Sequence, residues 1–290
     1  MDLSGFADEV GNEGPVTIAG LATRGGAVPE IRCVHAPAGI EWIEADEMRI
    51  ACGAGTPVAQ LAAALAEVGQ RAVLPDGGTV GGALAWGRSG IRRLGDGAVR
   101  DVLLQTRYVG ADGAVVKAGG PTVKNVSGFD VCRLLVGSQG TLGFLGEVIL
   151  RTRPIAPHSQ WFTCETDEPM RVFAAVHRPV SVLWDGFRVY VLLEGHHLDV
   201  AEQATRNKLH MIDAAPVLPP VRHTVRPADI VTLASRLVPG SFVAELGLGV
   251  LYADAGAVTP APIEPGVTAI GRRAKQQFDP AGRLNPGRVV

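Results

Sequence analysis

Glycine is concentrated in one stretch of this 290-residue chain, and this limits what the stretch can form. Seventeen of the 37 glycines lie between Gly77 and Gly146, whereas residues 151–290 contain ten. No Gly-X-Y period accompanies them, which excludes a collagen triple helix. A run with almost no side-chain bulk, such as residues 75–82, allows a ligand to lie directly on the main chain. We therefore expect the glycine-rich stretch to hold a bound molecule against its backbone.

The overall composition is that of a globular protein with one or two domains. Hydrophobic residues make up 47% of the chain and charged residues 19%, and about 100–200 residues per domain is usual. The net charge is −2 and no basic stripe is present, which argues against a nucleic-acid partner. The sequence has neither an uncharged apolar stretch of about 18 residues nor a signal-peptide pattern. We therefore expect no membrane span and a cytoplasmic location.

The cysteines and histidines do not follow the spacing of a metal site. Cys33, Cys52, Cys132 and Cys164 are scattered, and no C-x-x-C pair occurs. We expect reduced thiols, with neither a zinc site nor an iron–sulfur cluster in this chain. The pair His196-His197 precedes an expected helix, and we interpret it as two surface histidines rather than as metal ligands.

Hydrophobic periodicity and turn residues outline the first 155 residues. We expect helices over 3–10, 57–68 and 129–136, and strands over 16–19, 48–52, 101–109, 114–117 and 144–150. Thr56 suits the N-cap of the second helix, and Gly69 suits a left-handed residue at its end. The loop over residues 20–26 follows a strand, and it is either a phosphate-binding loop or an ordinary surface turn.

A fall in glycine density and two prolines, Pro154 and Pro157, mark a domain boundary near residue 155. Asp199, three residues before Glu202, fits the N-cap of a helix through Leu209. Beyond the boundary we also expect strands over 187–193 and 242–252 and helices over 228–237 and 267–278. This order predicts a small α+β domain.

Two familiar nucleotide-binding motifs do not fit the chain. The glycines of 137–143 have the spacing G-x-x-G-x-x-G, and they follow a helix and precede a strand, the reverse of a Rossmann turn. Gly53 and Gly55 follow a strand and open a helix, but Val58 stands where the third glycine belongs. The P-loop pattern is absent from the sequence.

Five motifs, in order along the chain, resemble a known flavoprotein family. They are Pro75 with 78–93, then 97–104, 119–120 with 123–130, 134–143, and the tail 278–280 with 284–288. Together they resemble the FAD-binding domain of the vanillyl-alcohol oxidase/p-cresol methylhydroxylase superfamily, and within it the FAD-binding subunits of bacterial glycolate oxidases. Two motifs narrow the resemblance to that branch. They are the double arginine before Gly-x-Val-Arg-Asp and the segment Lys-Asn-Val-x-Gly.

The resemblance implies an α+β fold, with a two-subdomain FAD-binding domain and a small α+β cap domain. Residues 1–155 would form the FAD-binding domain, and residues 156–266 a shortened cap that takes the substrate. Residues 267–290 would return to the FAD-binding domain as a C-terminal helix and tail.

The resemblance also implies which residues hold the FAD. The loop 20–26 would be the first pyrophosphate loop and 79–82 a second backbone cradle, while 89–90 and Gly97 would pass beside the dinucleotide. Leu145 would offer main-chain hydrogen bonds to the cofactor. Arg92 and Arg93 would pair with phosphate or with a substrate carboxylate, or else would be solvated loop charges. The predicted cofactor-binding residues are Ala22, Thr23, Arg24, Gly25, Gly26, Pro75, Gly78, Thr79, Val80, Gly81, Gly82, Ser89, Gly90, Arg92, Arg93, Gly97 and Leu145.

Some family features are missing, and each absence carries an expectation. No histidine or cysteine stands where relatives attach flavin covalently, so we expect dissociable FAD. The His-rich metal motif of related 2-hydroxy-acid dehydrogenases is absent, so we expect no metal. No catalytic side chain is identifiable. Tyr252, at the end of an expected strand, would either face the flavin or simply pack in the core.

Two functional hypotheses follow from the resemblance. The first is an FAD-dependent oxidoreductase, or a subunit of one, that oxidises a small 2-hydroxy acid such as glycolate or lactate and passes the electrons to a partner. A second flavoprotein subunit and an iron–sulfur subunit would be the partners, and they would place the protein in the cytoplasm or at the membrane periphery. The second hypothesis is a non-catalytic structural or electron-relay subunit of such a complex, which the short cap favours.

Overall fold

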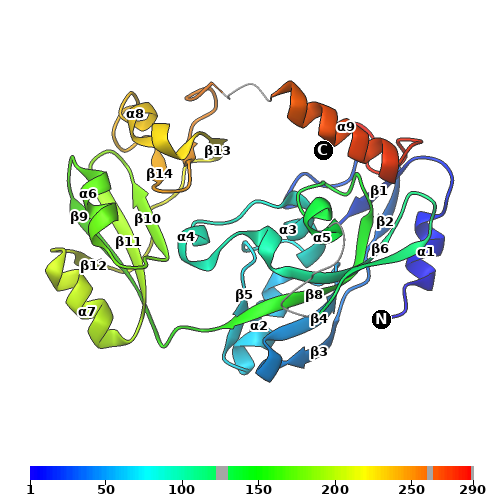
Figure 1. The fold of residues 1–290 in the computed structure, drawn as a ribbon, viewed down its shortest axis with the longest axis horizontal. Helices are drawn as coiled ribbons and strands as arrows, with labels where there is room; N and C mark the ends of the chain where they lie inside the picture. The colour runs from blue at the N-terminus through cyan, green and yellow to red at the C-terminus, as the bar shows by residue number, and fades with distance from the viewer. Residues whose placement is uncertain (122–129, 260–263, 289–290) are drawn as a thin grey trace. The chain divides into compact units, whose positions relative to one another are not determined.

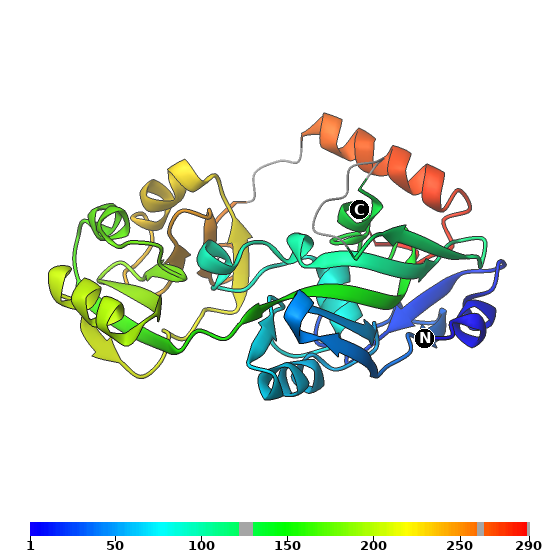
Figure 2. The same cartoon turned by 60° about the horizontal axis from the view of Figure 1, so that its bottom comes forward.

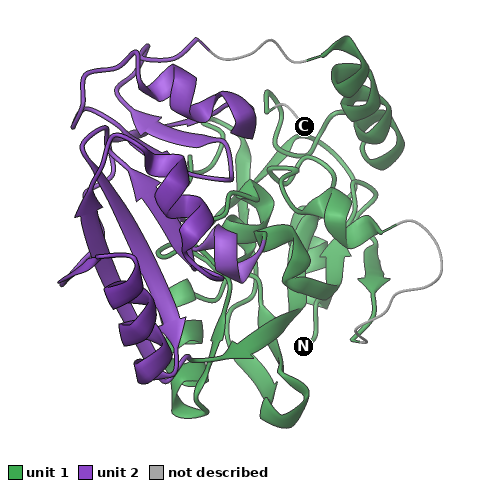
Figure 3. Ribbon diagram, turned by 60° about the vertical axis from the view of Figure 1, so that its left-hand side comes forward, with its two compact units in different colours: residues 1–90, 98–155, 263–290 green, residues 91–97, 156–262 purple. Residues whose placement is uncertain are grey.

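The computed structural model describes residues 1–121, 130–259 and 264–288, and these residues form two compact units (Figure 3). Unit 1 comprises residues 1–90, 98–155 and 263–290, and unit 2 comprises residues 91–97 and 156–262. The Lys-Asn-Val-x-Gly motif at 124–128 lies outside the described residues. Within the described ranges, no helix is long and apolar enough to cross a membrane.

Unit 1 is built on a six-stranded antiparallel sheet in which β8 is the central strand (Figure 1). The strand order is β3-β4-β8-β6-β7, and β5 pairs with the far end of β8. The strands are β3 Ile40–Glu44, β4 Arg49–Gly53, β5 Gln70–Ala72, β6 Leu103–Val109, β7 Val115–Gly119 and β8 Phe144–Pro154. Every residue from Phe144 to Leu150 is buried, so β8 forms the centre of the core.

Helices complete the core of this unit. Leu61 and Leu65 of α2, Leu84 of α3 and Leu135 of α5 join the buried cluster that includes Leu150 of β8. The helices of unit 1 are α1 Ser4–Val10, α2 Val58–Glu67, α3 Val80–Trp86, α5 Val131–Leu135 and α9 Pro265–Phe278, with 3₁₀ turns at Ala45–Glu47 and Val99–Asp101.

A smaller parallel pair of strands joins the two ends of the chain. β1 (Val16–Ala19) pairs with β2 (Arg32–His35), and Val16 also forms a parallel bridge with Leu284. Val16 and Leu284 are buried with Phe6 and Val10 of α1 in a separate apolar cluster. This brings the segment that follows α9, red in Figure 2, against the first strand.

The tail after α9 is fixed by two buried charged residues. Asp279 accepts hydrogen bonds from the Lys275 ammonium and from the backbone N–H groups of Arg283 and Leu284. Arg283 is buried, and its guanidinium donates to five backbone carbonyls, those of Val10, Gly11, Glu13, Gly14 and Ala111, at 2.6–2.9 Å. One side chain therefore satisfies the carbonyls of a turn that precedes β1 and of the β6–β7 loop.

Unit 2 is a seven-stranded antiparallel sheet in the order β12-β9-β11-β10-β14-β15-β13. Its strands are β9 His158–Glu165, β10 Ser181–Trp184, β11 Arg188–Gly195, β12 His210–Ile212, β13 Val221–Thr224, β14 Val243–Glu245 and β15 Val250–Ala253. Its helices are α4 Arg93–Asp96, α6 Pro169–Ala175, α7 His197–Arg206 and α8 Ile230–Ala234, with a 3₁₀ turn at Pro227–Asp229. Residues of α6, α7 and α8 pack on one face of the sheet, around Trp184 and Phe242.

Most expected elements form, but three local predictions are wrong. Pro57, not Thr56, caps α2, because the Thr56 hydroxyl is hydrogen-bonded to the backbone of Gly39. His196, not Asp199, caps α7, with Nδ1 accepting from the Leu198 N–H. The expected strand 242–252 is the hairpin of β14 and β15, because Gly247 and Gly249 turn the chain between them with positive φ.

The role of Arg283 in unit 1 is testable by substitution. Arg283→Gln removes a charged donor and leaves buried carbonyls without partners, so we expect the free energy of unfolding to fall by about 3 kcal/mol or more. Urea denaturation of the full chain measures this. Arg273→Gln, an exposed change on α9, is the matched control and is expected to change stability by less than about 0.5 kcal/mol. Equal midpoints for the two variants would contradict the assignment.

Candidate cofactor site

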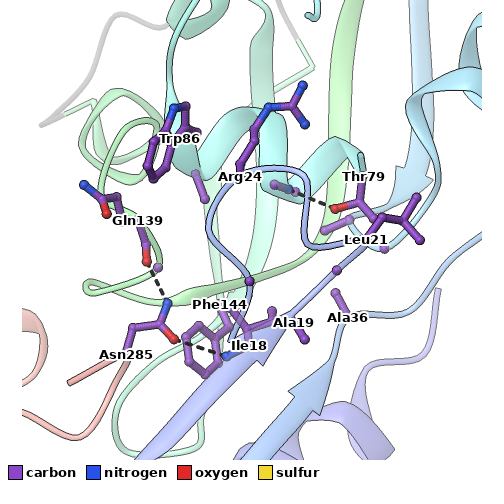
Figure 4. A pocket seen from close by; sticks show the side chains of 18 of the residues that line it. Ile18, Ala19, Leu21, Arg24, Ala36, Thr79, Trp86, Gln139, Phe144 and Asn285 are labelled. Atoms are coloured by element: carbon purple, nitrogen blue, oxygen red, sulfur yellow. Dashed lines mark hydrogen bonds between the residues drawn. The ribbon is translucent and has the colours of Figure 1, made fainter. Parts of the chain in front are cut away.

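A pocket opens in unit 1 where β1, the loop 20–26, α3 and the tail meet (Figure 4). It has about 720 Å³ of empty space, its open mouth included. It is lined by Ile18, Ala19, Gly20, Leu21, Ala22, Thr23, Arg24, Gly26, Ala36, Ala54, Gly55, Thr79, Gly81, Gly82, Ala85, Trp86, Gln139, Gly140, Gly143, Phe144, Asn285 and Arg288. Most of these residues are small, so the pocket wall is largely main chain.

The loop 20–26 lies directly against the beginning of α3. A Cβ added at Gly20 would lie 2.9 Å from the Thr79 hydroxyl oxygen, closer than packing allows. Thr79 caps α3, since this oxygen accepts the N–H of Gly82 at 3.1 Å. The structure therefore brings the two segments predicted to hold pyrophosphate side by side.

Arg24 ties the loop 20–26 to the next glycine-rich segment. Its guanidinium donates to the backbone carbonyls of Pro75, Asp76 and Gly77 at 2.8–3.2 Å. Partial burial lowers the pKa of Arg24, and the nearby Asp76 carboxylate opposes that effect. The geometry gives Arg24 a positioning role, and it adds positive charge to the pocket wall.

Asn285 connects three segments at the floor of the pocket (Figure 4). Its side-chain oxygen accepts from the Thr17 hydroxyl at 2.8 Å and from the Ile18 N–H at 3.2 Å, and its amide nitrogen donates to the Gln139 carbonyl at 2.7 Å. Asn285 is 2% exposed and has φ of 44°, a left-handed conformation that asparagine tolerates better than most residues.

Trp86 and Arg288 add an aromatic ring and a second cation. Both line the pocket, and Arg288 donates a hydrogen bond to the Gly26 carbonyl. The Arg88 guanidinium lies 4.7 Å from the centre of the Trp86 ring. A wall of backbone, two guanidinium groups and one indole suits a ligand that combines phosphates with a flat ring. The residues present therefore fit a flavin dinucleotide.

Seven of the residues predicted to bind the cofactor line this pocket: Ala22, Thr23, Arg24, Gly26, Thr79, Gly81 and Gly82. Gly25 lies beside Trp86 and Arg288, and Pro75 and Gly78 lie against Arg24, outside the lining. The Val80 and Leu145 side chains belong to the core, and the Ser89 hydroxyl, next to Gly90, accepts the Val99 N–H. The contacts of all these residues with the cofactor stay a prediction.

Arg92, Arg93 and Gly97 lie in unit 2 and are not in the lining of the pocket. Arg92 pairs with Asp96 at 3.1 Å and with Glu194 at 2.5 Å, both within that unit. Fifteen of the 22 lining residues were not among the predicted ones, and four of these have aromatic or polar side chains, namely Trp86, Gln139, Asn285 and Arg288. The tail motif that carries Asn285 and Arg288 was visible, but nothing in it indicated a pocket.

The glycine-rich stretch has a second cause besides the pocket. Of its glycines, Gly81, Gly82, Gly140 and Gly143 line the pocket. Others let segments of protein approach closely, since a Cβ at Gly119 would lie 2.2 Å from the Leu104 carbonyl oxygen. The glycine excess therefore reflects tight backbone packing as well as a ligand surface.

Comparison with known proteins defines the class. The family model of the FAD binding domain matches residues 31–119. Residues 31–119 are therefore similar to FAD-binding domains, as the motifs predicted, and FAD is the cofactor that this family of domains binds.

Individual relatives are similar over part of their length. The chain is 38% identical over 136 residues to glycolate oxidase subunit GlcE of Escherichia coli, a match that covers 44% of this chain and 37% of that protein. It is 38% identical over 141 residues to D-lactate dehydrogenase of Archaeoglobus fulgidus, covering 47% and 32%. These matches span about a third of each relative.

A solved structure has a similar overall fold. An alkyldihydroxyacetonephosphate synthase superposes with a TM-score of 0.65, covering 98% of this chain and 72% of that one at 15% identity. At that identity the likeness concerns the fold alone. It confirms the predicted α+β architecture.

Within the described part of the chain, no group of three or more His, Cys, Asp or Glu residues is placed to hold a metal ion. The His196 and His197 rings lie 4.5 Å apart, centre to centre, at the start of α7.

The Asn285 side chain offers a direct test of how the pocket is held. Asn285→Ala leaves the Gln139 carbonyl and the Ile18 N–H without their partners, so we expect a loss of about 2–4 kcal/mol in the free energy of unfolding. FAD affinity is expected to fall at least about tenfold. Urea denaturation and FAD titration measure the two effects. The control is Asn207→Ala in unit 2, which loses one hydrogen bond from the Asn207 side-chain amide to the Gln203 carbonyl. If Asn285→Ala binds FAD as tightly as this control does, the pocket does not depend on Asn285.

Proposed function

We propose that this protein is an FAD-dependent oxidoreductase, or the FAD-carrying subunit of one, that oxidises a small 2-hydroxy acid. The observation that carries the proposal is the backbone-walled pocket of unit 1, formed in part by the domain that matches the FAD binding family. The relatives named a glycolate oxidase subunit and a D-lactate dehydrogenase support this choice of substrate class.

The residues of the pocket hold the cofactor without a covalent bond in this proposal. The N–H groups of the loop 20–26 and of Gly81 and Gly82 bind the diphosphate, where no Cβ obstructs approach. Arg24 and Arg288 supply positive charge beside it, and the Trp86 ring stacks on a flat ring of the cofactor. When bound, FAD accepts the two electrons of the oxidation.

In this proposal unit 2 corresponds to the shortened cap, and it binds the substrate. A 2-hydroxy acid needs a cation for its carboxylate and a base for its hydroxyl proton. Electrons then pass to a partner subunit, for which a second flavoprotein and an iron–sulfur protein are the candidates. Two relatives, GlcE and GlcD, are named as glycolate oxidase subunits, which supports a multi-subunit assembly.

In a second candidate function, the protein binds FAD but does not itself oxidise a substrate. The match to GlcE extends over 37% of that protein, and a non-catalytic structural or electron-relay subunit would need only the FAD-binding unit. Reduction of the bound flavin by substrate separates the two functions.

FAD binding is expected to quench tryptophan fluorescence through Trp86. In the Trp86→Phe variant most of this quenching disappears, because Trp86 is the indole that lines the pocket among the residues the structure describes. Trp42→Phe, a half-buried change on β3, is the matched control and retains the quenching. Equal quenching in both variants would show that Trp86 does not contact the bound FAD.

The reaction is tested on the purified, FAD-loaded protein without oxygen. We expect glycolate or D-lactate to bleach the flavin absorbance in a single turnover, and acetate, which lacks the hydroxyl, to leave it unchanged. A protein that takes up no added FAD would overturn the proposal. A protein that binds FAD but is reduced by no 2-hydroxy acid, with and without copurifying subunits, would favour the electron-relay function.

A further inference from the structure

A cavity opens at one edge of the unit 2 sheet, beside the end of β9. β12 is the outermost strand at this edge, and its pairing with β9 ends at Thr163. The cavity lies where β9 continues past that point, and it is also lined by α6, by the turn after α7, by Arg188 of β11 and by His210 of β12. It has about 1570 Å³ of empty space, its open mouth included. We call it the β9 cavity.

The lining of the β9 cavity is basic, although the unit around it is acidic. Unit 2 contains ten Lys and Arg residues and twelve Asp and Glu residues. Four of the ten basic residues line the cavity, against two of the twelve acidic ones, Glu165 and Glu168. The four are Arg171 of α6, Arg188 of β11, Arg206 at the end of α7 and Lys208 in the turn that follows. Positive charge from separate elements therefore converges on one concave surface.

Lys208 is the most available of these cations. Its side chain is exposed, and its ammonium group forms neither a hydrogen bond nor an ion pair with the residues that the structure describes. The residue follows α7 with φ of 53°, in the left-handed position that glycine usually occupies because it has no Cβ. A lysine at this position costs stability relative to glycine, and it places an unpaired charge at the cavity.

The three arginines are paired only with carboxylates that face the solvent. The pairs are Arg171 with Glu168 at 3.1 Å, Arg188 with Glu165 at 2.9 Å, and Arg206 with Glu202. All six side chains are more than half exposed. Exposed ion pairs of this kind contribute about 0–1 kcal/mol. A ligand with several negative charges can therefore replace these carboxylates at little cost.

We propose that the β9 cavity binds a small molecule with two or more acidic groups, either a polycarboxylate or a diphosphate. Guanidinium groups bind carboxylates and phosphates through paired N–H donors, and an ammonium group adds a point charge. Because the cations line a single cavity bounded by α6, β9 and the end of α7, they suit a compact anion better than an extended acidic peptide. The residues of this cavity all lie in unit 2 and those of the cofactor pocket in unit 1, so the inference goes beyond the proposed function and does not depend on it.

Calorimetry of the FAD-loaded full chain at low ionic strength tests the proposal, with inorganic pyrophosphate and citrate as probes. We expect at least one of them to bind with a Kd below about 1 mM. Acetate, which carries a single charge, is expected to bind at least about tenfold more weakly. Binding of pyrophosphate alone would identify phosphate-bearing ligands, and binding of citrate alone would identify polycarboxylates. If neither probe binds, the proposal fails.

Hydrogen exchange locates the bound anion. At saturation with the probe, we expect slower exchange of the backbone amides of residues 163–172 and 206–210, because a ligand in the cavity opposes local opening of these segments. The amides of the β14–β15 hairpin are the internal control and are expected to be unchanged. Protection confined to the residues of the cofactor pocket would place the anion in unit 1 and would overturn the proposal.

Substitutions test the roles of the charged residues. Lys208→Gln removes the unpaired charge and is expected to weaken binding of the probe about fivefold or more. Glu168→Gln is expected to strengthen it about threefold, because Arg171 then has no competing carboxylate. The matched control is Arg226→Gln, since Arg226 forms an exposed pair with Asp229 outside the cavity. Equal weakening by Lys208→Gln and Arg226→Gln would show a response to net charge alone and would contradict the assignment.

A hexaglutamate peptide separates a small ligand from an acidic protein. A compact site contacts only part of such a peptide, so we expect it to bind no more tightly than the better of the two small probes. The opposite outcome is binding more than about tenfold tighter than either probe that is weakened by Lys208→Gln. In that case the cavity is a docking site for an acidic protein segment, and the small-molecule proposal is wrong.

Discussion

The carboxamide of Asn285 is the interaction on which the rest of unit 1 depends. One side chain joins the end of β1 to the loop that precedes β8, although these segments are more than a hundred residues apart in sequence. A Cβ at Gly140 would lie 2.7 Å from its amide nitrogen, so the glycine next to Gln139 is needed for this contact. Because the amide is buried, each of its bonds replaces one that water can no longer supply. The floor of the cofactor pocket is therefore held by polar contacts as well as by apolar packing.

The two faces of the unit 2 sheet differ in the side chains that they carry. The face covered by α6, α7 and α8 is apolar and accounts for the folding of the unit. The opposite face holds a buried carboxyl, a tyrosine hydroxyl and a guanidinium group, which weaken the unit rather than stabilise it.

The sequence predicted the parts of the structure that local patterns control. Residues 144–150 were predicted as a strand and lie in β8, helical spacing of apolar residues predicted α2, and residues 267–278 were predicted as the helix that α9 forms. The glycine run concealed α3, because Gly81 and Gly82 have low helix propensity and the helix is stabilised by the Thr79 cap and the buried Val80 and Leu84. Asn285 could not be assigned to the pocket, because its partners are set by tertiary contacts, and the β14–β15 hairpin was interpreted as one strand.

The contacts of Arg283 have a consequence for how the chain folds as it is synthesised. Residues 10–14 are synthesised more than 260 residues before the side chain that binds their carbonyls. Unit 2, which lies between them in sequence, can collapse on its own seven-stranded sheet while unit 1 is still incomplete. Assembly of the cofactor pocket therefore waits for the tail, and we expect unit 1 to complete its fold after unit 2.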